Sequence, residues 1–357
     1  MITIQAPGKL YIAGEYAVVE PGYPAVIVAL DQFVTVTIAE SREVGSIESK
    51  QYQENSLLWR RDGDEMVFDN RDNPFHYILS AIRITEQYAL EMGKTLKIFN
   101  LKINSELDAQ DGRKYGLGSS AAVTVGTIKA ISQFYQLNLD KDAIYKLAAI
   151  AHLDVQGNGS LGDIAASVYG GWIAYRSFNQ DWLRIKRNEA TLTALLKMDW
   201  PGLSVKMLTP PANLKLLIGW TGSPASTSRL VDKITVATAS KPELYQQFLT
   251  NSKRCVEQLI VGFETNDLGL IQQQIRANRQ ILQQLGKMSH VAIETRLLKQ
   301  MCDIAETHQG AAKTSGAGGG DCGIALVDQT QKAYEAIINA WQAIGVEPLK
   351  LKVHQIS

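Results

Sequence analysis

The segment best suited to chemistry is the glycine- and serine-rich stretch at residues 114–122, which reads Lys-Tyr-Gly-Leu-Gly-Ser-Ser-Ala-Ala. Its two glycines let the backbone turn and let a ligand approach closely. Ser119 and Ser120 are of a type that caps helices, and a helical pattern follows over residues 121–136. The free N–H groups at the start of such a helix favour an anion such as a phosphate. A glycine turn before an ordinary core helix explains the same stretch, so this segment alone leaves both interpretations open.

Two further glycine-rich loops lie at residues 156–163 and 313–323. Both match the G-x-G-x-x-G spacing of dinucleotide-binding turns. However, the first follows a predicted helix and the second precedes a predicted strand, so neither has the strand–loop–helix context that such a site requires. We interpret the first as a turn that places Ser160 and Asp163. The chain has no G-x4-G-K-S/T phosphate loop and no protein-kinase motif.

The elements that must position these loops alternate between strands and helices in both halves of the chain. Apolar runs and period-two alternation predict strands at residues 2–5, within 6–16 between two turns, at 24–30 and 33–38 as a pair, and at 57–60, 66–68, 95–103, 172–175, 214–220, 324–327 and 349–354. Helical spacing predicts helices at residues 75–92, 121–136, 141–154, 164–168, 241–263, 266–285, 291–307 and 330–344. The hydroxyl-rich loop at residues 221–228 can cap a further helix that starts near residue 227.

Composition narrows the class of protein. The chain has 357 residues, 45% of them hydrophobic and 20% charged, which suits a globular protein of two domains. Its net charge of zero favours neither nucleic acid nor an anionic membrane. No apolar run reaches the roughly 18–20 residues that span a bilayer, and the N-terminus does not read as a signal peptide. Three scattered cysteines suit a reducing cytosol. We therefore expect a cytoplasmic protein without nucleic-acid or membrane partners, and a homodimer stays open.

Three segments carry a family resemblance when they are taken together. Residues 7–15, 116–122 and 313–322 resemble, in order and spacing, the three motifs of the GHMP small-molecule kinases, and the resemblance extends over essentially the whole chain. It implies an α+β fold of two domains. Residues 1–204 would form an ATP-binding domain like ribosomal protein S5 domain 2, and residues 205–357 a ferredoxin-like domain, with ATP and substrate in the cleft between them.

The resemblance also implies an activity. Residues 9–18, 114–120, 158–163 and 219–224 are most similar to bacterial members that use ATP to phosphorylate mevalonate 5-phosphate to mevalonate 5-diphosphate in isoprenoid biosynthesis. The alternatives are mevalonate kinase or another small-molecule kinase of the family, and a catalytically silent ligand sensor on the same fold.

Roles for individual residues follow from the resemblance. Lys9 and Asp163 align with the catalytic pair. The ATP-binding residues would be Lys114, Gly116, Leu117, Gly118, Ser119, Ser120, Ala121, Ala122 and Gly318. The substrate-binding residues would be Lys9, Tyr16, Asn158, Ser160, Ser223 and Gly319.

Two of these roles keep alternatives. The hydroxyl of Ser120 would be a Mg²⁺ ligand, a share that suits an ion which also binds phosphates and water. For the second ligand, Asp154 is one option, whereas His152 is not the kind of group that Mg²⁺ prefers. Lys114, with Arg113, is either an ordinary surface basic pair or a contact with an acceptor that carries a carboxylate and a phosphate.

The nature of the acceptor decides what catalysis requires. The second pKa of a phosphate monoester is about 6, so the acceptor oxygen is mostly ionised at pH 7. The main need is then to bring two anions together rather than to remove a proton, and we expect Lys9 to bridge them with help from Mg²⁺.

Overall fold

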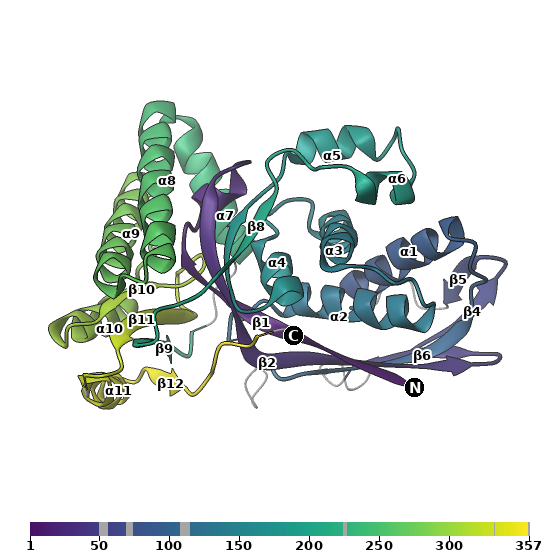
Figure 1. The fold of residues 1–357 in the computed structure, drawn as a ribbon, viewed down its shortest axis with the longest axis horizontal. Coiled ribbons are helices and arrows are strands. Elements are labelled where there is room, and N and C mark those ends of the chain that lie inside the picture. Colours follow the sequence, from purple (N-terminus) through teal and green to yellow (C-terminus); the bar gives the residue numbers. More distant parts are fainter. Residues whose placement is uncertain (50–55, 69–73, 108–114, 224–226, 332, 356–357) are drawn as a thin grey trace.

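The computed structural model describes residues 1–49, 56–68, 74–107, 115–223, 227–331 and 333–355. These residues build two sheets, a mixed one of eight strands and an antiparallel one of four, each with its own helices (Figure 1). The predicted α+β class is confirmed. None of the described helices is long and apolar enough to cross a bilayer.

The large sheet is organised around strand β2 (Pro24–Ser41), which pairs with β1 (Ile2–Ala13) along its length. The prediction of two short strands in each of these regions was wrong, because each region forms one long strand. The register of β1 on β2 shifts between Pro7 and Gly8, so the proline–glycine signal marks a β-bulge rather than a turn. The bulge keeps the strand continuous into the segment that carries Lys9.

The remaining strands extend this sheet on both sides of β2. The order is β5-β4-β3-β6-β2-β7-β8. These strands are β3 (Gly45–Ser49), β4 (Leu57–Asp62), β5 (Glu65–Phe68), β6 (Ile98–Ser105), β7 (Trp172–Arg176) and β8 (Ser204–Leu208). The sequence did not predict β3 or β8, which have only five residues each.

Four helices lie on one side of the large sheet (Figure 1). They are α1 (His76–Glu91), α2 (Ser119–Phe134), α3 (Lys141–Gln156) and α4 (Gly162–Tyr169), all close to their predicted positions. Helices α2 and α4 pack on β1 and β2, and α3 packs on α1, α2 and α4. Two short helices, α5 (Gln180–Lys186) and α6 (Leu192–Lys197), follow β7. Helix α2 sits close to the sheet because Gly126 faces Val36, where a Cβ atom would lie 2.9 Å from Cγ2 of the valine. This close packing holds α2 against the sheet. The helix begins at Ser119, where the glycine-rich loop at residues 115–118 ends.

The small sheet has the order β10-β11-β9-β12 and is antiparallel throughout. Its strands are β9 (Leu214–Trp220), β10 (Ala311–Thr314), β11 (Cys322–Asp328) and β12 (Glu347–Leu349). The helices of this half are α7 (Thr227–Ala239), α8 (Pro242–Glu264), α9 (Leu268–Ser289), α10 (Arg296–Thr307) and α11 (Ala333–Ala343). The chain order is that of a ferredoxin-like β-α-β-β-α-β unit whose first helical connection has grown to four helices. The ferredoxin-like prediction is confirmed.

The two halves are packed against each other. The rings of Trp172 and Phe263 lie 5.3 Å apart, and Arg176 forms an ion pair with Glu257 at 3.0 Å. A bridge between Leu30 and Val353 ties the end of the chain to the large sheet, where the sequence had predicted a full strand at residues 349–354. Since β8 still pairs with β7, the chain passes from one sheet to the other between residues 208 and 214. The domain division at residue 204 stays a prediction.

Candidate active site

The loop at residues 115–119 leads into α2 through two glycines in the left-handed backbone region. Gly116 has φ +77° and Gly118 has φ +81°, and Gly118 is the residue that caps the helix. The predicted serine cap was wrong, because Ser119 and Ser120 are the first two residues of α2 and no side chain caps it. The first N–H groups of any helix lack partners within the helix. The loop therefore presents backbone donors and two serine hydroxyls at the positive end of a helix dipole.

Lys9 lies directly against this loop. Its Nζ donates to the carbonyl oxygen of Gly116 at 3.1 Å, and its backbone N–H donates to the carbonyl of Leu117 at 2.9 Å. Its side chain runs across Gly118, where a Cβ atom would lie 2.9 Å from Cε of the lysine. Strand β1 thus places a cation beside the loop, and the glycine makes the room for it.

Ser120 faces a buried histidine. Its Oγ lies 3.3 Å from Nε2 of His152, a residue that is 1% exposed. Burial lowers the pKa of His152, and the negative charge of Asp163 acts in the other direction by raising it. Asp154, the option for a second Mg²⁺ ligand, instead forms a two-fold ion pair with Arg187 at 2.5 and 3.0 Å. The geometry gives this option no support, because the carboxylate is already paired with Arg187.

The described residues contain no group of three His, Cys, Asp or Glu side chains that could hold a metal ion. The donor set at Ser120 fits Mg²⁺ only as one hydroxyl that completes a shell of phosphate oxygens and water, which is the way this ion is usually bound beside a nucleotide.

Asp163 lies in the first turn of α4, where one carboxylate oxygen accepts a hydrogen bond from the N–H of Ile164 at 3.0 Å. Two residues before the helix, the Oγ of Ser160 lies 2.7 Å from the hydroxyl of Tyr11, and the carbonyl of Ser160 accepts from Tyr175 at 2.5 Å. The pKa of Tyr11 is raised, first by burial and then by the charge of Asp163. Strand β1 therefore carries both Lys9 and the tyrosine that orients Ser160.

The third glycine loop forms a backbone wall beside the first. Gly318 passes so close to Ile293 that a Cβ atom would lie 2.2 Å from its carbonyl oxygen, and the N–H of Gly319 donates to the same carbonyl at 2.8 Å. A Cβ atom on Gly116 would lie 2.7 Å from Oδ2 of Asp321. The wall and the loop at residues 115–118 are thus in contact where the side chain of Asp321 meets Gly116.

Four contacts tie this wall to the N-terminal half. Lys313, fully buried on β10, forms an ion pair with Glu15, and Glu15 also accepts from the N–H of Gly316 at 3.3 Å. The hydroxyl of Ser315 donates to the carbonyl of Tyr11 at 2.7 Å. Tyr16 donates to the carbonyl of Ala317 at 2.6 Å. The sequence did not predict this ion pair. Its signal in the sequence was that Glu15 ends the first motif and Lys313 begins the third.

The other predicted residues lie in several settings. Tyr16 is 6% exposed and its hydroxyl is engaged by the wall, so its predicted substrate contact gains no support from this geometry. Asn158 and Ser223 are exposed, and the carbonyl of Ser223 accepts from the N–H of Asp321 at 2.8 Å. Cys322 is buried and its thiol pKa is raised by burial, which confirms it as a small core residue. Residues 113 and 114 lie outside the described part of the chain.

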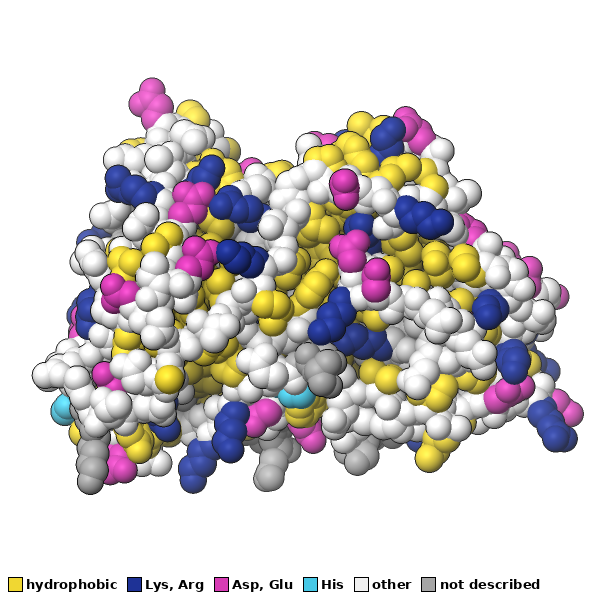
Figure 2. Space-filling view, in the orientation of Figure 1, with side chains coloured by type: hydrophobic (Ala, Val, Ile, Leu, Met, Phe, Trp, Pro, Cys, Tyr) yellow, Lys and Arg dark blue, Asp and Glu magenta, His cyan; other side chains and the backbone are white. Residues whose placement is uncertain are grey.

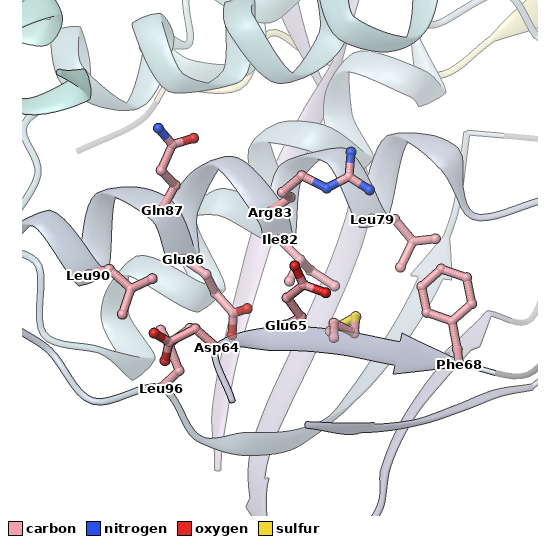
Figure 3. A pocket seen from close by; sticks show the side chains of 11 residues that line it. Asp64, Glu65, Phe68, Leu79, Ile82, Arg83, Glu86, Gln87, Leu90 and Leu96 are labelled. Carbon is pink, nitrogen blue, oxygen red and sulfur yellow. The ribbon is translucent and has the colours of Figure 1, made fainter. Parts of the chain in front are cut away.

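A separate hollow of about 510 Å³ lies between α1 and the β4–β5 hairpin (Figure 3). It is lined by Asp64, Glu65, Met66, Phe68, Leu79, Ile82, Arg83, Glu86, Gln87, Leu90 and Leu96. No residue predicted for the active site lines it. On the face seen in Figure 2, basic and acidic side chains are interspersed, and neither sign forms a continuous field.

Known proteins resemble this chain over its full length. Residues 76–171 match the model of the GHMP kinases N terminal domain, and residues 259–346 match that of the GHMP kinases C terminal domain. The phosphomevalonate kinase of Streptomyces sp. strain CL190 is 38% identical over 98% of this chain and 96% of its own. The mevalonate kinase of Methanocaldococcus jannaschii is 28% identical over 92% of this chain and 93% of its own. The structure of Streptococcus pneumoniae phosphomevalonate kinase in complex with phosphomevalonate and AMPPNP superposes with a TM-score of 0.86, at 32% identity over 99% of this chain and all of that one.

Proposed function

The chain belongs to the GHMP kinase family, and on that basis we propose that it transfers the terminal phosphoryl group of ATP to mevalonate 5-phosphate, giving mevalonate 5-diphosphate and ADP. The observation that carries the proposal is the full-length likeness to phosphomevalonate kinase, which exceeds the likeness to mevalonate kinase. A solved relative that superposes over the whole chain holds phosphomevalonate and AMPPNP together.

Charge dictates what this reaction asks of the protein. The acceptor phosphate, with a second pKa of about 6, is mostly a dianion at neutral pH, and it must approach a second highly charged anion. Lys9 supports the proposal because its ammonium group lies beside the loop at the start of α2, where the phosphates of ATP would bind. A fixed cation between donor and acceptor lowers their repulsion in the ground state and stabilises the charge that moves during transfer.

The backbone supplies the rest of the phosphate site. The N–H groups at the start of α2 would hold ATP phosphates, and the wall that includes Gly318 and Gly319 would close the other side. The Ser120 hydroxyl would hold Mg²⁺, which neutralises phosphate charge when it is bound.

Asp163 has a secondary part in this proposal. An ionised acceptor needs no strong base, so Asp163 would orient Lys9 and the acceptor. Ser160 is our first choice for a donor to the acceptor, because Tyr11 fixes its hydroxyl near Asp163. Asn158, Ser223 and Tyr16 stay as predicted contacts.

An acceptor panel tests the proposal. Purified protein is incubated with Mg·ATP and with mevalonate, mevalonate 5-phosphate or mevalonate 5-diphosphate, and ADP release is followed. We expect turnover with mevalonate 5-phosphate and a kcat/KM at least 100-fold lower with the other two. Preference for mevalonate would establish the mevalonate kinase alternative. Absence of ADP release with every acceptor would favour a silent sensor.

The cytoplasm remains the expected compartment.

A further inference from the structure

The buried imidazole of His152 has no part in the reaction described so far. It projects from α3 toward the first turn of α2, and its ring packs on Tyr77 with the ring centroids 4.9 Å apart. Its Nε2 lies 3.3 Å from Oγ of Ser120. Its Nδ1 has no hydrogen-bond partner among the described residues. The contact with Ser120 is therefore the polar interaction that orients the ring.

Packing alone does not account for a histidine at this position. A buried nitrogen that lacks a partner costs about 1–3 kcal/mol, and an aromatic hydrocarbon ring would fill the same space without that cost. The polar ring thus carries a penalty at Nδ1, while its Nε2 meets Ser120, the residue that we propose as a Mg²⁺ ligand. A buried group without a partner in a native structure calls for an explanation.

The chemistry of a hydroxyl group shows what His152 provides. A serine hydroxyl has one proton and two lone pairs. When its oxygen binds a cation, the proton must point to another acceptor. Within the part of the chain that the structure describes, Nε2 of His152 is the side-chain group within hydrogen-bond distance of Ser120 Oγ. A neutral imidazole accepts that proton without competing for Mg²⁺, which prefers oxygen ligands.

We propose that His152 is a positioning residue: its Nε2 accepts the hydrogen bond of the Ser120 hydroxyl and thereby turns the lone pairs of Oγ toward the Mg²⁺ that accompanies ATP. The inference rests on the proposed function of Ser120 as a Mg²⁺ ligand. It assigns a specific tautomer, with the single proton of the ring on Nδ1.

Nucleotide binding gives the first test. The dissociation constant of AMPPNP is measured by calorimetry with and without Mg²⁺ for the wild type, His152→Phe and His152→Gln. Loss of a residue that orients a metal ligand costs about 10- to 100-fold. We expect that loss for His152→Phe in the presence of Mg²⁺, little change in its absence, and substantial recovery in His152→Gln, whose amide can accept the same hydrogen bond. An unchanged Mg²⁺-dependent affinity in His152→Phe would overturn the proposal.

A double-mutant cycle separates positioning from general packing. If His152 acts through Ser120, the His152→Phe change should cost nothing further in a Ser120→Ala background. An equal loss in both backgrounds would show that the ring is merely structural. Thermal melting of each variant reports whether it folds.

A measurement on the unmodified protein keeps the proposal testable if the variants fail to fold. Nitrogen-15 NMR distinguishes the two neutral tautomers of each of the five histidines, and the nuclear Overhauser contacts between the rings of His152 and Tyr77 assign the signal in the unmodified protein. The Nδ1–H tautomer is expected in the complex with Mg·AMPPNP, and the Nε2–H tautomer would contradict the inference. These readouts do not involve the acceptor, so failure of the acceptor panel and failure of this inference are distinguishable.

Discussion

The carboxylate of Glu15 and the ammonium group of Lys313 form an ion pair that is buried on both sides, with 3% and 0% of the side chains exposed. Glu15 follows strand β1 of the large sheet and Lys313 lies on β10 of the small sheet, 298 positions later. Lys313 also donates to the carbonyl of Thr314 at 2.7 Å. The pair therefore fixes the third glycine loop against the segment that carries Lys9, and it joins the two halves of the site.

Breaking this pair should destabilise the fold strongly. Lys313→Met leaves Glu15 as a buried charge without its partner, and we expect the free energy of unfolding to fall by about 3–5 kcal/mol. Urea denaturation followed by circular dichroism measures it. The matched control is Arg184→Met, which removes an exposed pair with Asp181 and should cost less than about 1 kcal/mol. Equal losses in the two variants would contradict the role assigned to the buried pair.

Gly118 should be needed for activity as well as for backbone conformation. A Cβ atom there would meet Cε of Lys9 at 2.9 Å, so Gly118→Ala should displace the lysine and lower kcat by at least tenfold. Gly157, which ends α3, has nearly the same φ of +80°, but a Cβ atom there would have no other atom within 4 Å, so Gly157→Ala is the control. Both variants should lose about 1–2 kcal/mol of stability from the left-handed backbone. Equal activity in the two variants would show that the displacement of Lys9 does not matter.

Lys129 should make stability depend on pH in the alkaline range. Burial, with a contribution from Lys141, lowers its pKa to about 8, against about 10.4 in an unfolded chain. Between these values the unfolded chain binds the extra proton, so the free energy of unfolding rises with pH. Below pH 8 the native protein bears the full cost of the buried charge. Lys129→Met removes that cost, so its stability advantage over the wild type should be larger at pH 7.5 than at pH 9.5.

The pH comparison has a direct measure. The advantage of Lys129→Met should shrink by about 1–2 kcal/mol between the two pH values in urea denaturation. Lys102→Met, at an exposed lysine, should show no such change. A constant difference between Lys129→Met and the wild type would mean that Lys129 does not titrate in this range.

The long helices of this fold could be predicted from the sequence, because each of them buries one apolar face and repeats with its period. Helix α9, for example, buries Ile271, Ile275 and Leu282 at helical spacing. The helices α5 and α6, of seven and six residues, were not predicted. Strands were harder to predict. β10 has four residues and offers no alternation to detect, and the length of β2 depends on its several pairing partners, which only the tertiary structure supplies.

The active-site loops could also be found from their glycines and serines, but the contacts between them could not. The partnership of Tyr11 with Ser160 joins residues 149 positions apart, and that of Ser120 with His152 joins residues 32 apart. Local sequence carries no sign of such pairs. The serine cap was predicted wrongly for a related reason, since Gly118 takes the capping position in a loop that hydrogen-bonds to Lys9, a residue more than 100 positions away.

The comparison of Lys9→Met with Asp163→Asn tests the central claim most directly, namely that neutralising two anions matters more than removing a proton. With saturating Mg·ATP and mevalonate 5-phosphate, Lys9→Met should lower kcat by about 100- to 1000-fold, as for the loss of a fixed charge-stabilising group. Lys9→Arg, which keeps the charge, should retain more activity. Asp163→Asn should lose less than about 100-fold, the lower bound for loss of a general base. A loss in Asp163→Asn equal to or larger than that in Lys9→Met would contradict the account.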